Sequence, residues 1–276
     1  MRPPRRIRIG NQTSVAAANI TQPFDHAVAS GFDAFEWFPD WTDAGHGWQE
    51  KDLDRKARRS IRDAAARNDI ALSVHIPWRL DLTHPEDFDR AVQSVRFARD
   101  IGADLMVVHF GDNQNREAYR LAIERLLQGH LGPAMRLAVE NTPQTAPEEL
   151  DALFAKLGAL PGRGSRAGIC LDIGHANLCP RTRNDYLGFI DMLDPEVPII
   201  HVHLHENYGD ADSHLTVFTG PSMADRSGID GFVQRMKQRR FSGAIILEQW
   251  PRPATLLDRA RKLLYQAFGD YAQGPP

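Results

Sequence analysis

The chain has 276 residues, of which 42% are hydrophobic and 25% are charged, and its formal net charge is −3. This composition is ordinary for a folded globular protein, and the length leaves ample chain for a hydrophobic core. The pI of about 6.4 excludes a global basic field that would draw the chain to a polyanion, but it does not exclude a local basic groove.

Cysteine content and the chain start narrow the class of protein further. The two cysteines, Cys170 and Cys179, form no Cys-x-x-Cys pair, which excludes a thiolate zinc motif and a disulfide framework. The basic first residues are not followed by the apolar stretch of a signal peptide. No apolar run reaches the roughly eighteen residues of a membrane span, so we expect a cytoplasmic protein with no membrane partner.

Strand-like and helix-like segments alternate along the chain. Short apolar runs predict strands, and segments with apolar residues every three to four positions predict helices. The expected strands are 7–12, 32–38, 70–77, 104–111, 135–142, 167–172, 199–207 and 243–248. The expected helices are 23–30, 52–68, 85–101, 117–129, 147–157, 186–193, 228–239 and 254–268.

This alternation predicts a fold. Most of the strands are continuous runs of Val, Ile, Leu and Ala, as expected of parallel strands that are buried on both faces. Strand followed by helix, about eight times with short connections, predicts a single (β/α)8 TIM barrel in the α/β class, with one domain over residues 1–276. A doubly wound open sheet is the alternative, but the Gly-rich phosphate loop common after its first strand is missing.

The seventh strand carries three histidines that alternate with apolar residues, namely His201, His203 and His205. A strand has a period of two residues, so the three imidazoles share one face. Burying imidazoles without partners costs free energy. A metal ion would be such a partner, and core histidines bonded to the backbone are the alternative.

Polar residues also stand where the other strands end. Barrel enzymes carry their chemistry at the carboxyl ends of the strands. The potential metal ligands or acid/base groups at these ends are Glu36, His75, His109, Glu140, Asp172, His175, His203 and Glu248, and Asp212 and His214 follow in the long connection 208–227. Mixed carboxylate and imidazole ligands suit Zn, Mn, Co or Fe rather than Ca, and this set suffices for one to three ions.

Candidate substrate contacts lie near the same strand ends. We expect them from Glu36, Trp37, Trp78, His205 and Arg252, and Arg79 is a further candidate to hold an anionic substrate. The aromatic residues Trp37, Phe38, Trp41 and Trp48 either line the substrate pocket or cap the core. Glu206 is either a carboxylate behind the ligands or a solvated side chain. The remaining histidines are expected at the surface, and they are His26, His46, His84 and His130.

These motifs resemble the xylose isomerase-like barrel superfamily, which includes sugar isomerases and epimerases and endonuclease IV. The matching segments run in the family's order over nearly the whole chain, at 73–78, 107–111, 137–142, 168–175, 201–204, 212–214 and 246–248. Together they are specific for the superfamily and only weakly specific for a reaction.

The isomerase and epimerase branch implies one divalent metal. Its Glu, Asp, His, Glu ligand set falls on Glu140, Asp172, His203 and Glu248. The resemblance then implies a metal-stabilised enediolate, with Glu140 and Glu248 as acid/base groups on opposite sides of the substrate. His175 would assist by bonding a substrate hydroxyl.

The endonuclease IV branch implies three zinc ions and cleavage of a phosphodiester at abasic DNA sites. Its nine ligands fall on His75, His109, Glu140, Asp172, His175, His203, Asp212, His214 and Glu248. Trp78 would stand where that family places an aromatic wedge. Several multimetal enzymes clamp both oxygens of a phosphoester in this way.

Local patterns depart from the endonuclease. That family reads Asp-Thr-Cys-His after strand six, whereas this chain reads Asp172-Ile173-Gly174-His175. It continues His-Leu-Asn-Asp after strand seven, whereas this chain reads His203-Leu204-His205-Glu206. The loop after the Asp-x-His ligands lacks the usual Gly-Glu-Gly, and we find no basic stripe to follow a DNA backbone.

The sequence therefore favours a metal-dependent sugar or sugar-derivative isomerase or epimerase with a small carbohydrate-like substrate. The alternative is an endonuclease IV-like multinuclear zinc phosphodiesterase, for which nucleic acid would be the partner. A third hypothesis is a barrel that only binds a carbohydrate. A homo-oligomer is left open, and fold analogy alone is a weak warrant for a reaction.

Overall fold

The computed structural model describes residues 6–41, 45, 47–111, 115–158 and 166–274. Eight parallel strands form a closed barrel in chain order, and β1 pairs with both β2 and β8. This closure confirms the predicted (β/α)8 fold and excludes the open sheet. The strands are β1 (Ile7–Gln12), β2 (Ala34–Trp37), β3 (Ala71–His75), β4 (Leu105–His109), β5 (Arg136–Glu140), β6 (Ala167–Asp172), β7 (Ile199–Leu204) and β8 (Gly243–Leu247).

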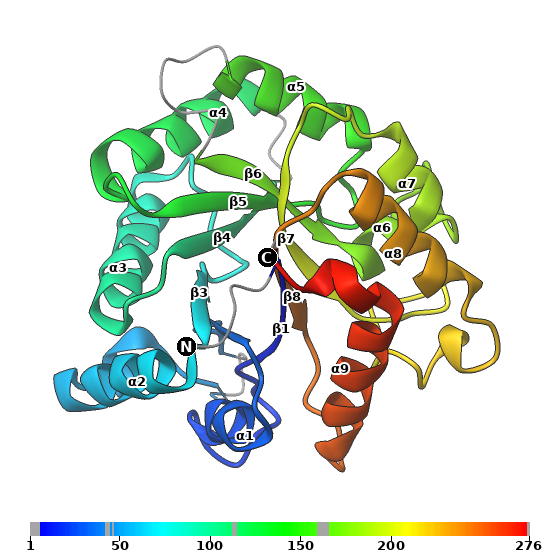
Figure 1. Cartoon of the computed structure of the whole chain (residues 1–276). Coiled ribbons are helices and arrows are strands. Elements are labelled where there is room, and N and C mark those ends of the chain that lie inside the picture. The colour runs from blue at the N-terminus through cyan, green and yellow to red at the C-terminus, as the bar shows by residue number, and fades with distance from the viewer. Residues whose placement is uncertain (1–5, 42–44, 46, 112–114, 159–165, 275–276) are drawn as a thin grey trace.

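Helices form an outer ring around the strands (Figure 1). The α-helices of the described residues are α1 (Gln22–Ser30), α2 (Arg55–Asn68), α3 (Pro85–Ile101), α4 (Arg116–Arg125), α5 (Pro147–Gly158), α6 (Ile173–Leu178), α7 (Tyr186–Met192), α8 (Ser227–Gln238) and α9 (Thr255–Phe268). Short 3-10 turns cover Glu50–Asp52, Pro221–Met223 and Gly269–Ala272. The boundaries agree with the predicted segments to within a few residues.

Helix ends follow local sequence signals. The Asp54 side chain accepts a hydrogen bond of 2.8 Å from the backbone N–H of Ala57 and so caps the start of α2. Gly31 and Gly102 end α1 and α3 with φ angles of 68° and 78°, in the left-handed region that glycine adopts without strain.

Two segments differ from the predicted helices. The helix expected over 117–129 ends at Arg125 and continues as a single π turn, Leu126–His130. The helix α6 was not predicted, because six residues are too few to establish a helical period. It starts directly after β6 and therefore places its first residues at the mouth of the barrel.

Two apolar clusters pack against the barrel strands, one outside the barrel and one inside it. The larger one lies between strands and helices, where Trp37 of β2 packs against Phe24 of α1 and Phe97 of α3. The smaller one contains Leu105, Val107, Ala138 and Cys170. Because Met106 and Val108 belong to the larger cluster, the alternating residues Leu105 and Val107 face the barrel interior. This inner cluster is small, and polar side chains occupy the interior toward the carboxyl ends of the strands.

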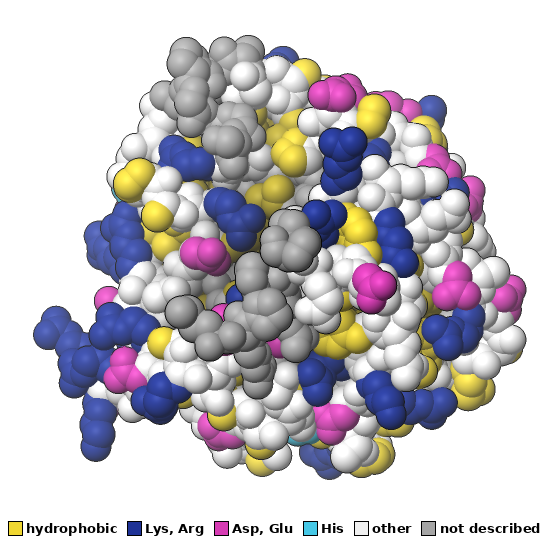
Figure 2. Space-filling view, viewed as in Figure 1, with side chains coloured by type: hydrophobic (Ala, Val, Ile, Leu, Met, Phe, Trp, Pro, Cys, Tyr) yellow, Lys and Arg dark blue, Asp and Glu magenta, His cyan; other side chains and the backbone are white. Residues whose placement is uncertain are grey.

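Charged side chains are spread over the face shown in Figure 2, with acidic groups between the basic ones. The densest gathering of Lys and Arg on that face lies over α2 (Figures 1 and 2). Within the described part of the chain, no helix combines the length and the apolar composition that a bilayer crossing requires.

Candidate metal centre

A cavity of about 620 Å³ opens at the carboxyl ends of the strands. Its polar walls come from residues that end strands or follow them, so the barrel closure itself brings these side chains together. The sequence-predicted residues that line it are His75, Trp78, His109, Glu140, His175, Asp212, His214 and Glu248. Asp172 and His203 lie beneath this wall, fully buried.

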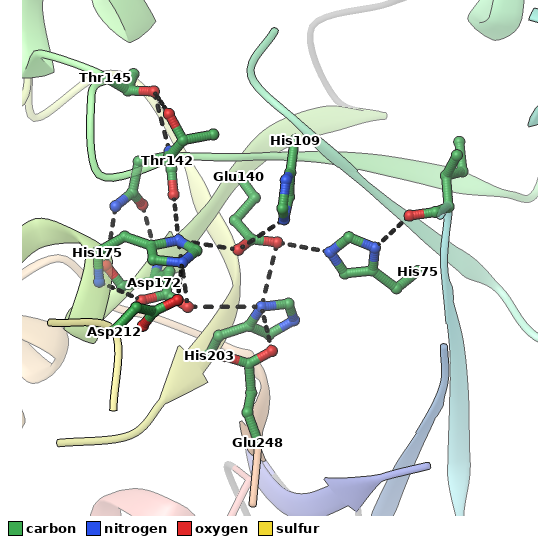
Figure 3. A network of polar contacts seen from close by, with 12 residues as sticks. His75, His109, Glu140, Thr142, Thr145, Asp172, His175, His203, Asp212 and Glu248 are labelled. Carbon is green, nitrogen blue, oxygen red and sulfur yellow. Dashed lines mark hydrogen bonds and ion pairs between the residues drawn. The ribbon is translucent and has the colours of Figure 1, made fainter. Parts of the chain in front are cut away.

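Glu140 is the hub of the site, as Figure 3 shows. Its buried carboxylate is 2.8 Å from His75 Nε2 and 3.4 Å from His109 Nε2. The other contacts are to His175 Nδ1 at 3.3 Å and His203 Nδ1 at 3.2 Å. Four imidazoles from four different elements therefore meet at one carboxylate.

Backbone carbonyls fix the orientation of two of these rings. His75 Nδ1 lies 2.5 Å from the carbonyl oxygen of Ile76, and His175 Nδ1 lies 2.9 Å from that of Asn141. A nitrogen that faces a carbonyl must carry the proton, so a neutral ring presents a lone pair at Nε2. For His75 that lone pair faces Glu140, so two acceptors meet unless a second proton or a cation lies between them.

Pairing with neighbouring groups shifts the pKa values of the cluster. Burial lowers the pKa of His175 and of His203, but Asp172 and its neighbouring carboxylates outweigh burial at His175, and Cys170 together with the surrounding glutamates outweighs it at His203, so both pKa values lie well above the usual value. Burial raises the pKa of Glu140, but the imidazoles outweigh it and hold that pKa well below its usual value. Burial leaves the pKa of Glu248 well above its usual value, despite the attraction of His203.

Candidate ligand atoms fall into adjoining groups. Within each group of the described residues, the ligand atoms lie within 4.8 Å of one another. The groups at the mouth are His75, His109 and Glu140; Glu140, Asp172 and His203; Asp172, His205 and Glu248; and His175, His205, Asp212 and His214. Because successive groups share Glu140, Asp172 or His205, a multinuclear centre fits the arrangement.

Buried polar atoms without hydrogen-bond partners also indicate that these residues fit divalent metal ions. Buried atoms without an aligned hydrogen-bond partner include Asp172 Oδ2, His203 Nδ1 and Glu248 Oε2. Leaving buried polar atoms unsatisfied costs free energy, and metal coordination would remove that cost. The mixed imidazole and carboxylate donors suit Zn, Mn, Co or Fe.

Asn141 supports the ligands and was missed by the sequence reasoning. Its side chain donates to the carbonyl of Asp172 at 2.9 Å and accepts from the backbone N–H of Asp172 at 2.9 Å. Its own carbonyl accepts from His175. The available signal was its position, because it is an amide directly after the candidate ligand Glu140 at a strand end, and the structure shows it buried.

The long connection 208–227 delivers the last two predicted ligands. Asp212 Oδ2 lies 3.3 Å from His175 Nε2 and 3.2 Å from His214 Nε2. The buried Glu206 carboxylate accepts backbone N–H bonds from Gly220 at 2.9 Å and Ser222 at 3.3 Å. Glu206 therefore holds this connection in place and is not a solvated side chain.

Glu36, a predicted substrate contact, lies apart from the residues that line the cavity. Its carboxylate is fully buried inside the barrel, below the cavity wall. Oε2 accepts hydrogen bonds from Ser73 Oγ at 2.8 Å and His201 Nε2 at 2.9 Å. Oε1 lies 2.9 Å from His203 Nε2. Glu36 therefore lies behind the candidate ligand His203 and does not reach the cavity.

Three further predicted substrate contacts do not line the main cavity. Trp37 is fully buried in the core and does not reach the cavity. Arg252 is exposed and is not among the residues that line the cavity. His205 is buried beside the candidate metal ligands and faces a separate cavity of about 270 Å³. Trp78, in contrast, lines the main cavity with 46% of its surface exposed.

The remaining aromatic residues divide between pocket and core. Phe38 lines the cavity with its ring centroid 4.5 Å from that of His75, whereas Trp48 is buried in the core. The guanidinium of Arg90 lies over the ring of Trp41, 4.6 Å from its centroid.

The histidines expected at the surface lie outside the cavity lining as far as the structure describes them. His26 contacts Asp258 at 3.1 Å, and His84 has 70% of its side chain exposed. His130 is half-buried beside the ring of Phe88. His46 lies outside the described residues.

Solved structures of other proteins share this barrel fold. A D-tagatose 3-epimerase-like protein superposes with a TM-score of 0.72 at 19% identity, over 94% of this chain and 96% of that chain. Endonuclease IV from Thermus thermophilus gives a TM-score of 0.67 at 21% identity, over 94% of this chain and 98% of that chain. At such identities the likeness shows the fold and does not choose a reaction.

Sequence comparison extends the same relationship. The uncharacterized protein MJ1311 of Methanocaldococcus jannaschii is 23% identical over 257 residues, which cover 83% of this chain and 79% of that protein. A family model described as the xylose isomerase-like TIM barrel matches residues 24–267. That match spans most of the closed barrel and its ring of helices, and the chain therefore belongs to the xylose isomerase-like TIM barrel family.

Proposed function

We propose that this chain is a divalent-metal-dependent hydrolase of phosphoesters whose centre holds more than one ion. One observation carries the proposal. In adjoining groups of candidate ligands, imidazole nitrogens that present a lone pair face carboxylate oxygens, and metal ions between them would resolve this contact. A single-ion isomerase needs only Glu140, Asp172, His203 and Glu248. It gives no metal-binding role to the oriented rings of His75 and His175.

The summed charge of the carboxylates also supports a centre with more than one ion. Four carboxylates converge on the mouth, from Glu140, Asp172, Asp212 and Glu248, and together they carry about −4 when ionised. One divalent ion would leave this cluster near −2, which repels an anionic substrate. Three ions would bring it to about +2, which attracts the negative charge of a phosphoester.

The chain's own residues would bind and shield the substrate. Bound divalent ions would supply Lewis-acid polarisation of the phosphoryl oxygens and compensate the developing charge. Phe38 and Trp78 would offer apolar surfaces on the cavity wall and limit access of water. Arg79, whose guanidinium lies 4.9 Å from the ring centroid of Trp78, would add positive charge at the cavity. His75 and His175 would keep their orientation through the carbonyls of Ile76 and Asn141.

A single-metal sugar isomerase or epimerase is the second candidate, and one observation favours it. His203 Nδ1 lies 3.2 Å from Glu140, 3.9 Å from Asp172 and 3.2 Å from Glu248, which makes a compact site for one ion. In this alternative one of the two glutamates would remove the proton next to a carbonyl, and the other would return it. His175 would bond a substrate hydroxyl.

The first experiment measures the metal content of protein that is purified without exposure to a chelator. We expect two or three Zn, Mn, Co or Fe ions per chain. Hydrolysis of bis(p-nitrophenyl) phosphate and of an abasic-site oligonucleotide would be measured on the same samples, with Glu140→Gln as the inactive variant. Glu149→Gln is the matched control, because Glu149 bonds Arg116 on the helical ring and does not line the cavity.

The second candidate predicts different outcomes. One ion per chain, together with solvent-deuterium exchange into ketose sugars and no phosphoester hydrolysis, would overturn the hydrolase proposal. Two or three ions with hydrolysis and no such exchange would support it. The cytoplasmic location and a homo-oligomeric state stay predictions.

A further inference from the structure

His205 is a buried histidine whose ring nitrogens lack aligned hydrogen bonds. Its side chain is fully buried, and neither Nδ1 nor Nε2 has an aligned partner among the described residues. A buried imidazole without an aligned hydrogen-bond partner is costly, and a metal ion bound at this ring would remove that cost.

Oxygen atoms of the candidate metal ligands surround His205 Nε2. The distances are 3.2 Å to Asp172 Oδ1, 3.7 Å to Asp212 Oδ1 and 3.7 Å to Glu248 Oε2. The ring lies parallel to that of His214, with 3.9 Å between centroids and 6° between planes, so both rings can direct a lone pair at one ion only when one of them turns. His205 therefore reaches the ligands of the mouth from the side of the smaller cavity.

The distances from Asp212 Oδ2 to His175 and His214 match the donors of one small ion, and a ligand atom of His205 lies within 4.8 Å of the ligand atoms of all three. A tetrahedral zinc ion with bonds of about 2.0–2.1 Å places its donor atoms about 3.3–3.4 Å apart. Asp212 Oδ2 lies 3.3 Å from His175 Nε2 and 3.2 Å from His214 Nε2. Asp212 Oδ1, on the other side of the same carboxylate, lies 3.7 Å from His205 Nε2.

Gly174 makes the room that His205 occupies. A Cβ atom at Gly174 would lie 1.9 Å from Cε1 and 2.3 Å from Nε2 of His205, closer than any real contact. Gly174 and His205 are two positions where the sequence departs from the endonuclease IV pattern, which has Cys and Asn there. The two departures touch in space, so a side chain at the first position would exclude the imidazole at the second.

We propose that His205 is a fourth protein ligand of the ion held by His175, Asp212 and His214, in a pocket that Gly174 keeps open. The inference rests on the multinuclear metal binding of the proposed function and not on its reaction. Four protein ligands complete the shell of a structural zinc site, whereas three leave a position open. This ion would stabilise the long connection 208–227, and the substrate would meet the ions held by the Glu140 groups.

The test compares metal retention in wild type, His205→Asn, Gly174→Ala and the double variant. Each protein is loaded with Zn²⁺, passed through a desalting column and analysed for metal, and the binding steps are then measured by competition with a chromogenic chelator. His26→Asn is the matched control, because His26 contacts Asp258 away from the mouth. Circular dichroism of the metal-free proteins checks that each variant folds.

We expect His205→Asn to lose one ion per chain, or to bind one ion at least about 100-fold more weakly. Gly174→Ala should weaken the same step because the methyl group displaces the ring. The double variant should be no worse than His205→Asn alone, since both changes remove one interaction. In Co²⁺-loaded protein, the visible absorption that is typical of four-coordinate Co²⁺ should decrease in His205→Asn.

The outcomes separate this inference from the proposed function. A wild type with two or three ions, and an unchanged set of binding steps in His205→Asn, would refute the role of His205 and leave the multinuclear hydrolase standing. A wild type with one ion would contradict both. Loss of a binding step in His205→Asn without any phosphoester hydrolysis in the wild type would retain the site and reject the reaction.

Discussion

Two polar clusters inside the same barrel differ in whether hydrogen-bond donors are present for their acceptors. The lower cluster consists of Glu36, Ser73 and His201, and the upper cluster contains the candidate ligands at the mouth. In the lower cluster one carboxylate meets a hydroxyl and an imidazole that can donate to it, at 2.8 and 2.9 Å. In the upper cluster several carboxylates meet rings whose Nδ1 protons are already held by backbone carbonyls.

The comparison teaches that burial alone does not identify a metal site. Residues of the same types are fully buried in both clusters. In the lower cluster Glu36 Oε2 has two donors, and only Oε1, 2.9 Å from His203 Nε2, lacks an aligned hydrogen bond, whereas the upper cluster has more acceptors than donors. His203 connects the two, because Nε2 faces Glu36 at 2.9 Å and Nδ1 faces Glu140 at 3.2 Å.

Breaking the upper cluster should have the largest effect. Glu140→Gln removes the charge that four imidazoles share, and Gln cannot bridge two ions. The lost electrostatic stabilisation of several kcal/mol should reduce phosphoester hydrolysis roughly 10³-fold. Steady-state kinetics and metal analysis would measure both losses. Glu149→Gln should retain activity and metal, and full activity of Glu140→Gln would contradict the proposed centre.

Changing the lower cluster should have an intermediate effect. Glu36→Gln keeps the size of the side chain but removes the carboxylate behind His203. Replacing such supporting groups typically lowers metal affinity about 10- to 100-fold. Chelator competition would measure the affinity of the ion that His203 holds. Asp33→Asn is the control, because Asp33 is a buried carboxylate of similar depth that accepts from Tyr265 away from the mouth. Equal affinity losses in both variants would mean that Glu36 acts only on stability.

Strand periodicity could predict which residues share a face but not which face that is. Glu36 and Trp37 are neighbours on β2, so their side chains point to opposite sides of the barrel wall, and both could not line one pocket. The structure turns Glu36 inward and Trp37 toward the helices. Glu36 also pairs in register with Ser73, two residues before His75, which puts it below the cavity wall.

The candidate ligand set could be predicted from the sequence because the barrel brings all strand ends to one mouth. His75, His109, Glu140 and Asp172 each end a strand as expected. What could not be predicted are contacts between segments far apart in sequence. The fit of His205 against Gly174 and the paired bonds of Asn141 with Asp172 depend on the packing of α6 against β7.

Removing the metal should reverse the pH dependence of stability. Burial lowers the pKa of His214, but Asp212 and other carboxylates outweigh it and raise that pKa from the ordinary 6.5 to about 9. The folded chain then binds a proton more tightly than the unfolded chain. This contribution is fully present below about 6.5 and is lost as the pH rises through about 9.

With metal bound, the same imidazole must be neutral, so stability should hold or rise over this pH range. Urea unfolding at several pH values, with chelator and with Zn²⁺, would measure the two trends. His214→Gln should flatten the decline of the metal-free protein. A metal-free protein whose stability rises between these pH values would contradict the assignment of a proton to this cluster.

The smallest effect on stability is expected at the rim of the mouth. Trp78 is 46% exposed and lines the cavity, and its ring lies under the guanidinium of Arg79. Trp78→Ala removes surface that is already half in water, so the free energy of unfolding should change by no more than about 0.5 kcal/mol. A substrate that stacks on the ring would lose about 1–3 kcal/mol of binding if it presents a base, which raises KM with little change in kcat.

Leu121→Ala, at an exposed position away from the cavity, is the control for stability. An unchanged KM in Trp78→Ala would place the substrate deeper in the mouth, against Phe38 and the candidate ligands.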